Sequence, residues 1–155
     1  MTVRNPSAHV DSWYSQSAAP APEHPRLQGR ETADVVVLGA GLTGLSAALE
    51  LAQAGRSVIV VEARRVGWGA SGRNGGQVIF GFGCEQNKIA AMVGPALSRR
   101  LFDWSVEGVR LVRERIAAHG IDADWRDGHA HVAIKPRHID ELKAWQADLA
   151  EKKVT

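Results

Sequence analysis

Residues 34–62 read DVVVLGAGLTGLSAALELAQAGRSVIVVE, and this stretch decides the fold. Val35–Leu38 and Val58–Val61 are unbroken apolar runs, which are typical of parallel strands covered on both faces. Between them, apolar residues recur at helical spacing up to Gly55, where a helix would end in a left-handed turn. The stretch therefore predicts a β-α-β unit.

Three glycines follow the first predicted strand with the spacing G-x-G-x-x-G. We expect Gly39 to permit a tight turn, Gly41 to let phosphate oxygens approach the backbone, and Gly44 to let the helix lie close to the strand. The unpaired amides of the first helical turn and the helix dipole favour an anion there. Glu62 ends the second run, where a carboxylate accepts hydrogen bonds from ribose hydroxyls. The pattern predicts an adenine dinucleotide, and the acid at position 62 disfavours NADP but leaves FAD and NAD open.

The composition of the 155 residues is that of a soluble globular domain. Its 19 basic and 17 acidic residues are interspersed, so the net charge of +2 does not indicate nucleic-acid binding. No apolar stretch approaches a membrane span and no secretory leader is evident, so we expect a cytoplasmic protein. Cys84, the only cysteine, excludes an internal disulfide and a cysteine-based metal cluster, and we expect it to be a small buried thiol.

Outside the β-α-β unit, the positions of prolines and glycines indicate where segments of the chain begin and end. Four of the six prolines lie in the first 25 residues, which predicts an extended arm held to the body by Trp13 and Tyr14. Apolar residues at helical spacing then predict a helix that ends at Gly120, and a second helix after Pro136. The expected segments are an arm (1–33), a β-α-β unit with a glycine-rich loop (34–92), a helix (93–120), and a hairpin around residues 127–128 followed by a helix (121–155).

These motifs resemble the N-terminal part of the D-amino-acid-oxidase-like FAD-dependent oxidoreductases, which include glycine and sarcosine oxidases. The likeness runs through SWYSQSA, VVVLGAGLTGLSAALELAQAG, VVEARRVGWGASGRNGGQ and RERIAAHGIDADWRDGHAHVAI, as far as Ile134. Its most specific part is GASGRNGGQ, within a stretch (67–83) that holds seven of the sixteen glycines. The resemblance implies an α/β fold, with a Rossmann-like FAD-binding β-α-β unit and the start of an antiparallel substrate-domain sheet.

The resemblance also implies where FAD binds. The pyrophosphate would contact Gly39, Gly41 and Gly44, and the ribose would lie at Glu62, next to Ala63. The loop beside the flavin ring would supply Ala70, Ser71, Arg73, Asn74, Gly75, Gly76 and Gln77.

The glycines and the polar residues of this flavin loop have expected roles. Gly75 and Gly76 let backbone amides approach the flavin without steric hindrance, and we rank them first. Arg73 is expected either to add charge near phosphate or flavin, or to form a surface ion pair. Asn74 and Gln77 suit hydrogen bonds to flavin or backbone, and Ser71 suits the cap of a short helix.

The activity implied by the resemblance is oxidation of a carbon–nitrogen bond by hydride transfer to FAD. The leading small-molecule amine substrate is gamma-glutamylputrescine, which would yield an aldehyde, ammonia and, with oxygen as the electron acceptor, hydrogen peroxide. No side chain is an obvious catalytic base. His129 and His131 alternate along a predicted strand without a third ligand, so we expect no metal site. An NAD-dependent dehydrogenase and a non-catalytic dinucleotide-binding module stay open as alternatives.

Members of the family are much longer than this chain. The later strands, most of the substrate sheet and much of the flavin cover would come from a C-terminal part that the chain lacks. We therefore expect a truncated fold that binds flavin weakly and turns over no substrate alone.

Overall fold

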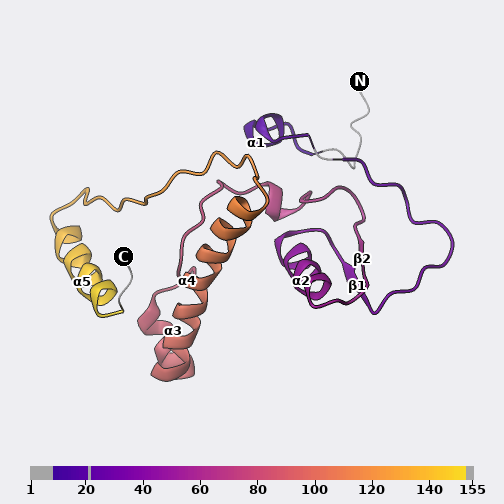
Figure 1. The fold of residues 1–155 in the computed structure, drawn as a ribbon. Coiled ribbons are helices and arrows are strands. Elements are labelled where there is room, and N and C mark those ends of the chain that lie inside the picture. Colours follow the sequence, from indigo (N-terminus) through magenta and orange to yellow (C-terminus); the bar gives the residue numbers. More distant parts are fainter. Residues whose placement is uncertain (1–8, 21, 153–155) are drawn as a thin grey trace. The chain divides into compact units, whose positions relative to one another are not determined.

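The computed structural model describes residues 9–20 and 22–152. The chain divides into two compact units, and the boundary lies between Gln77 and Val78. The elements of the first unit are α1 (Trp13–Ser17), β1 (Val35–Leu38), α2 (Leu42–Gln53), β2 (Val58–Val61) and a 3₁₀ turn, η1 (Ala70–Gly72) (Figure 1). The elements of the second unit are α3 (Gln86–Val93), α4 (Pro95–Ala118) and α5 (Arg137–Glu151). Each unit is a separate structural body.

The predicted β-α-β unit is confirmed. Strands β1 and β2 are parallel, with Val35 opposite Val58 and Leu38 opposite Val61, and α2 packs against both strands (Figure 1). Gly55 ends α2 as predicted, because it adopts a φ of 79° that favours glycine. The N–H of the following residue, Arg56, donates to the Leu51 carbonyl at 3.0 Å, which completes a Schellman cap.

Only one face of β1 is covered among the residues described. Val35 and Val37 point to the α2 side and are half-buried, whereas the exposed fractions of Val36 and Leu38 are 54% and 82%. The prediction that both faces are buried is therefore not met within this unit, because one helix covers one face of a sheet. The bare face remains apolar.

The arm contains a short helix where the sequence predicts extended chain. α1 begins at Ser12, whose hydroxyl accepts the Ser15 N–H at 3.3 Å, while Ser15 Oγ accepts the Ser12 N–H at 3.1 Å. This reciprocal capping satisfies two amides that a helix start leaves unpaired. The prediction that both arm aromatics hold the arm to the body is wrong for Trp13, which is 76% exposed.

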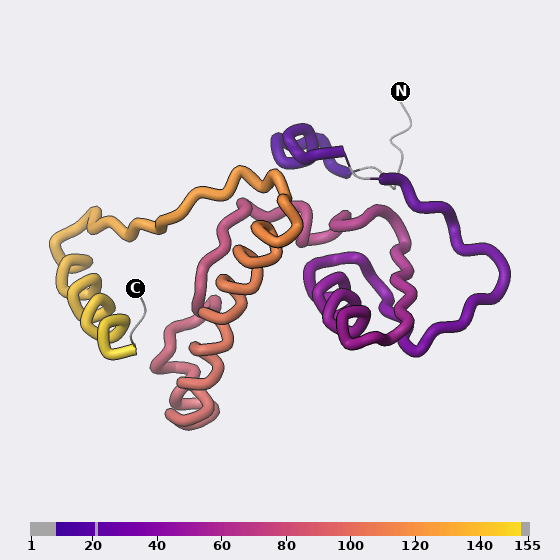
Figure 2. Tube along the Cα trace, in the orientation of Figure 1, coloured from indigo at the N-terminus to yellow at the C-terminus, as the bar shows by residue number. Residues whose placement is uncertain are grey.

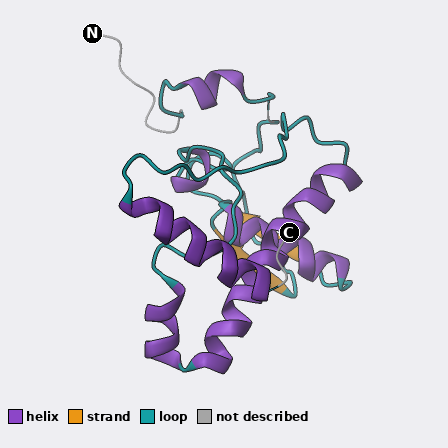
Figure 3. Ribbon diagram, turned by 90° about the vertical axis from the view of Figure 1, so that its left-hand side faces the viewer, coloured by secondary structure: helices purple, strands orange, loops and turns teal. Residues whose placement is uncertain are grey.

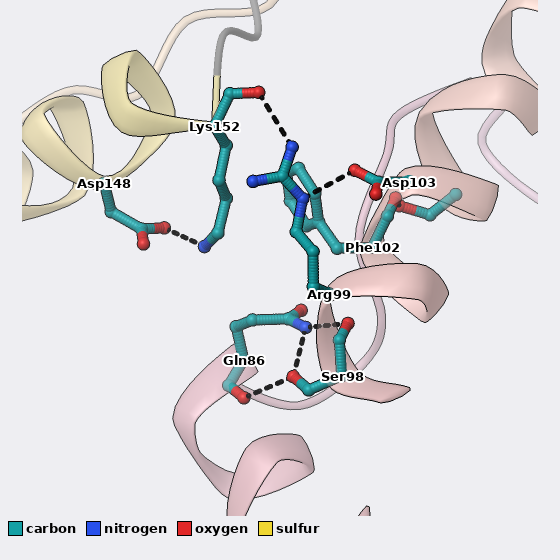
Figure 4. Close-up of polar contacts among 8 residues, drawn as sticks. Gln86, Ser98, Arg99, Phe102, Asp103, Asp148 and Lys152 are labelled. Atoms are coloured by element: carbon teal, nitrogen blue, oxygen red, sulfur yellow. Dashed lines mark hydrogen bonds and ion pairs between the residues drawn. The ribbon is translucent and has the colours of Figure 1, made fainter. Parts of the chain in front are cut away.

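In the second unit, α3 and α4 pack as a helical hairpin around Gly94, which has a φ of 82°, and Pro95, the first residue of α4. The side-chain amide of Gln86 donates to both the carbonyl and the hydroxyl of Ser98 at 2.7 Å (Figure 4). Ser98 is only 3% exposed, so this contact lies in the seam between the helices. α4 ends at Ala118, with His119 as its C-cap and Gly120 directly after it at a φ of 57°, which confirms the predicted stop.

The predicted hairpin around residues 127–128 is wrong, and the start of an antiparallel sheet is therefore not seen. Residues 121–134 contain no strand and follow an extended path between α4 and α5 (Figure 2). Asp127 instead accepts hydrogen bonds from Arg113 and from the Trp125 indole N–H, both at 2.9 Å. A hairpin without further strands is marginally stable in water, so local side-chain bonds prevail. The helix predicted after Pro136 is present as α5 (Figure 3).

Cys84 is exposed, which corrects the prediction of a buried thiol. It lies in coil before α3, where no neighbouring element covers it. His131 stacks edge-on with Trp145 at 4.2 Å and with His129 at 4.4 Å, and no cluster of three metal-binding side chains occurs in the described part of the chain. No helix within those residues is long and apolar enough to cross a membrane.

Candidate cofactor site

The glycine turn joins β1 to α2 through close backbone packing. Gly39 has a φ of 102° and its N–H donates to the Val61 carbonyl at 2.7 Å, so the chain leaves the sheet in a conformation that favours glycine. A Cβ on Gly44 would lie 2.1 Å from the Gly39 carbonyl oxygen and 3.2 Å from Val37 Cγ1. The helix therefore lies against the end of β1 only because position 44 has no side chain.

The first turn of α2 is capped from a distant part of the sequence. Its N-cap residue, Gly41, has no side chain to accept a helical amide, and the Ser71 hydroxyl accepts the Leu42 N–H at 3.0 Å instead. The prediction that Ser71 caps a short helix of its own is thus wrong, since it lies inside η1 and caps α2. A Cβ on Gly41 would lie 3.0 Å from the same hydroxyl. The later amides of this turn have no partner within the helix and point at its open end.

Glu62 links the end of β2 to the glycine turn. One carboxylate oxygen accepts the Ala40 N–H at 2.8 Å and the other accepts the Arg64 N–H at 2.9 Å. The hydrogen bond from Ala40, followed by that from Arg64, lowers the pKa of Glu62 below its usual range. The Ala63 N–H lowers the same pKa, and because an ionised carboxylate has about four acceptor positions, acceptor capacity remains open to a ligand. Ala63, the next residue, is exposed.

The rest of the flavin loop is held mostly by its own residues. Arg73 Nε donates to the Trp68 carbonyl at 2.9 Å, and its Cζ lies 4.1 Å from the centroid of the Trp68 ring. Asn74 Nδ2 donates to the Ser71 carbonyl at 2.9 Å, and Asn74 Oδ1 accepts the Gly76 N–H at 2.8 Å. Gly76 has a φ of 72°, so this loop conformation favours glycine at position 76.

The structure thus groups the predicted residues unequally. The three glycines, Glu62 and Ser71 meet around residues 40–42, where Gly67 also donates its N–H to the Ala40 carbonyl at 2.9 Å. The hydrogen bonds of Arg73 and Asn74 stay within residues 68–76, and Gln77 is exposed. Arg73 contacts the carbonyl and the ring of Trp68.

Trp68 is a residue that the sequence reasoning missed. Its ring lies beneath two guanidinium groups, with Arg64 Cζ at 3.5 Å and Arg73 Cζ at 4.1 Å from the ring centroid. Cation–π contacts of this kind hold an arginine without an acidic partner. The signal was an aromatic residue in the glycine-dense stretch, flanked on both sides by arginines.

Comparison with known proteins identifies the family. Residues 34–154 match the DAO family, which is described as FAD dependent oxidoreductase. The chain belongs to this family. FAD is therefore the cofactor of the family to which the β-α-β unit and its glycine turn belong, and this favours FAD over NAD.

Two curated relatives of this DAO-family chain are oxidoreductases. The chain is 45% identical over 134 residues to the probable oxidoreductase OrdL of Haemophilus influenzae, and 41% identical over 135 residues to gamma-glutamylputrescine oxidoreductase of Escherichia coli strain K12. The matches cover 86% and 87% of this chain but 31% and 32% of the relatives. The chain thus spans about a third of the length of these relatives. No solved structure gives a significant match.

Proposed function

We propose that the chain is the FAD-binding part of an oxidoreductase that oxidises an amine, and that the turn at residues 39–44 with Glu62 is its nucleotide site. The observation that carries this proposal is the hydrogen bond from the Ala40 N–H to Glu62 at 2.8 Å, which fixes the acid beside the glycine turn. The open amides at the start of α2 suit the pyrophosphate, and the open acceptor positions of Glu62 suit ribose hydroxyls. Absence of a side chain at Gly41 keeps this surface within reach of a ligand, and absence of one at Gly44 lets the helix lie against β1.

Ser71 suits a second role at this site. Its hydroxyl accepts the Leu42 N–H and still has its own proton to donate, and a phosphate oxygen at the helix start is an acceptor for it. We assign the remaining cofactor contacts to Ala63, Ala70, Arg73, Asn74, Gly75, Gly76 and Gln77. In this assignment, the Asn74 side chain orders the loop by accepting the Gly76 N–H, and the Gly75 amide is the one presented to the flavin.

The family and the name of one relative support the reaction that we propose. When bound, FAD supplies the two-electron chemistry that oxidises the carbon–nitrogen bond of an amine. We propose gamma-glutamylputrescine as the substrate, because a relative that is 41% identical is named for it. The products would be an aldehyde and ammonia, with hydrogen peroxide where oxygen is the acceptor. Residues 34–92 would bind FAD, and residues 121–155 would begin the part that holds the amine.

Titration of the purified chain with FAD tests the cofactor assignment. Flavin fluorescence should be quenched with saturation at one FAD per chain, and Glu62→Gln should weaken binding by about tenfold, because an amide cannot replace a carboxylate that accepts four hydrogen bonds. Glu31→Gln, at an exposed glutamate of the arm, is the matched control and should bind as the unaltered chain does. Saturable binding of NAD in place of FAD would contradict the assignment.

The substrate assignment needs a separate measurement. Anaerobic addition of gamma-glutamylputrescine to the intact, FAD-loaded enzyme should bleach the flavin absorbance, whereas putrescine and glutamate serve as the matched comparison compounds. Equal bleaching by putrescine would reject the role of the gamma-glutamyl group. Absence of bleaching by all three compounds would reject the proposed substrate class and leave the FAD assignment standing.

A further inference from the structure

A cleft of about 930 Å³ lies beside Glu62, within the first unit. One wall comes from the chain after β2, including Glu62, Arg64 and Arg65, and the other wall comes from the arm. The arm side chains that line it include those of His9, Tyr14, Glu23, His24 and Arg26. Pockets that hold cofactors typically enclose about 300–1,000 Å³, so the cleft has room for one half of a dinucleotide.

The arm reaches the body of the unit at three places. Glu23 and Arg65 form an ion pair at 2.9 Å. The hydroxyl of Tyr14 lies 3.9 Å from the position that a Cβ on Gly75 would occupy, and His9 Cε1 lies 3.8 Å from the corresponding position on Gly72. The arm is thus placed against both the segment after Glu62 and the flavin loop.

The charge of the cleft suits a phosphorylated ligand. Three arginines line it, at positions 26, 64 and 65, against the carboxylates of Glu23 and Glu62. Glu23 is paired with Arg65, and both oxygens of Glu62 accept backbone amides. Cationic side chains therefore outnumber the acids, and the acids are already engaged.

Glu62 belongs both to this cleft and to the glycine turn. The lining of the cleft does not include the three glycines, so the cleft adjoins the glycine turn through Glu62 and Gly67. A dinucleotide with its phosphates at α2 and a ribose at Glu62 would extend its adenine toward the cleft.

We propose that arm residues 9–20 and 22–26 form the outer wall of the adenosine subsite for FAD and that the Glu23–Arg65 ion pair holds this wall in place. The proposal rests on the assignment of FAD to the glycine turn. In this proposal the arm contributes to the affinity for FAD. The arm would cover the adenosine half of FAD and not the flavin half.

Three variants of the full chain test the proposal. Glu23→Gln breaks the ion pair, Glu31→Gln makes the same charge change on an exposed part of the arm outside the cleft, and the double variant E23R/R65E restores the pair with the charges exchanged. Binding of FAD, ADP and FMN is measured by titration calorimetry. A fourth chain that lacks residues 1–26 removes the arm wall, and far-UV circular dichroism checks that α2 is retained in it.

Glu23→Gln should weaken binding of FAD and of ADP by a common factor of about two to five, which is the range for loss of one exposed ion pair. Removal of a negative charge alone would strengthen binding of these anions, so the direction separates release of the arm from a general charge effect. E23R/R65E should restore affinity, Glu31→Gln should not weaken it, and deletion of the arm should cost about tenfold or more for FAD and ADP but nothing for FMN.

Unchanged affinity of Glu23→Gln for both FAD and ADP would overturn the proposal, as would an effect on FMN that equals the effect on ADP. If the shortened chain has lost its helical signal, the comparison of Glu23→Gln with Glu31→Gln decides. Failure of the unaltered chain to bind FAD would instead overturn the proposed function, and the assignment of the arm with it.

Discussion

Glu62 shows how one side chain joins several parts of the site. Its two oxygens accept amides from the glycine turn and from the residue after next along the chain, and these bonds favour the ionised form. Its pKa in the folded chain is therefore below its value in the unfolded chain. By linkage, its contribution to stability is present above the unfolded pKa and is lost as the pH falls through the folded pKa.

The first prediction concerns this pH dependence. The free energy of unfolding should fall as the pH is lowered from about 6 to about 3, because protonation of Glu62 breaks the two amide contacts. Glu62→Gln should be less stable than the unaltered chain at neutral pH, and the difference should shrink across that interval. Urea denaturation followed by circular dichroism measures both chains, with Glu31→Gln as control. A difference that does not change with pH would contradict this account of the carboxylate.

The second prediction compares two glycines of the turn. Gly44→Ala places a Cβ 2.1 Å from a backbone oxygen that cannot move without distorting β1, and this should outweigh the gain of about 1 kcal/mol that alanine brings to a helix interior. Gly41→Ala meets only the Ser71 hydroxyl at 3.0 Å, which a rotamer change relieves. Gly44→Ala should therefore lower the denaturation midpoint much further than Gly41→Ala does. The reverse order would show that α2 does not lie as close to β1 as described.

At the scale of elements, local sequence signals predict those elements that depend on local chemistry. Periodicity and the positions of glycine or proline predict the strands, α2 with its cap at Gly55, the end of α4 shortly before Gly120 and the start of α5 after Pro136. The hairpin at residues 127–128 fails because strand pairing depends on partners elsewhere in a sheet. Ser71 could be picked as a capping residue, but which helix it caps depends on a contact across 29 positions of sequence.

The third prediction tests the seam between α3 and α4. Ser98→Ala removes the hydroxyl that accepts the Gln86 amide and should cost about 1 kcal/mol, because the seam is buried and water cannot replace the bond (Figure 4). Gln86→Leu should cost a similar amount, and the double variant should cost less than the two together. A thermodynamic cycle from urea denaturation measures this coupling. Strict additivity would contradict a direct bond between the two side chains.

At the scale of the whole molecule, the main feature is apolar surface on the two-stranded sheet. The side of β1 opposite α2 presents Val36 and Leu38, which are 54% and 82% exposed. Contiguous apolar surface of this kind marks an interaction site in a folded protein. The chain spans about a third of the length of its relatives.

The fourth prediction follows from that face. The chain should bind the hydrophobic dye ANS, and Leu38→Lys should reduce the bound dye while changing the free energy of unfolding by less than about 0.5 kcal/mol, since this side chain is already in water. Leu27→Lys, at an exposed leucine of the arm, provides the matched control and should leave dye binding unchanged. Equal dye binding by all three chains would place the apolar surface elsewhere.

The contacts of Glu62, Gly67 and Ser71 with residues 40–42 also have a kinetic consequence. Because these hydrogen bonds are made within the protein, the turn at the proposed diphosphate site has its conformation before any nucleotide binds. Little backbone freedom is left to lose there upon binding, so the entropic penalty of association falls mainly on the ligand. We therefore expect the nucleotide to bind a preorganised site at a rate set by diffusion and orientation, without a slow folding step at the turn.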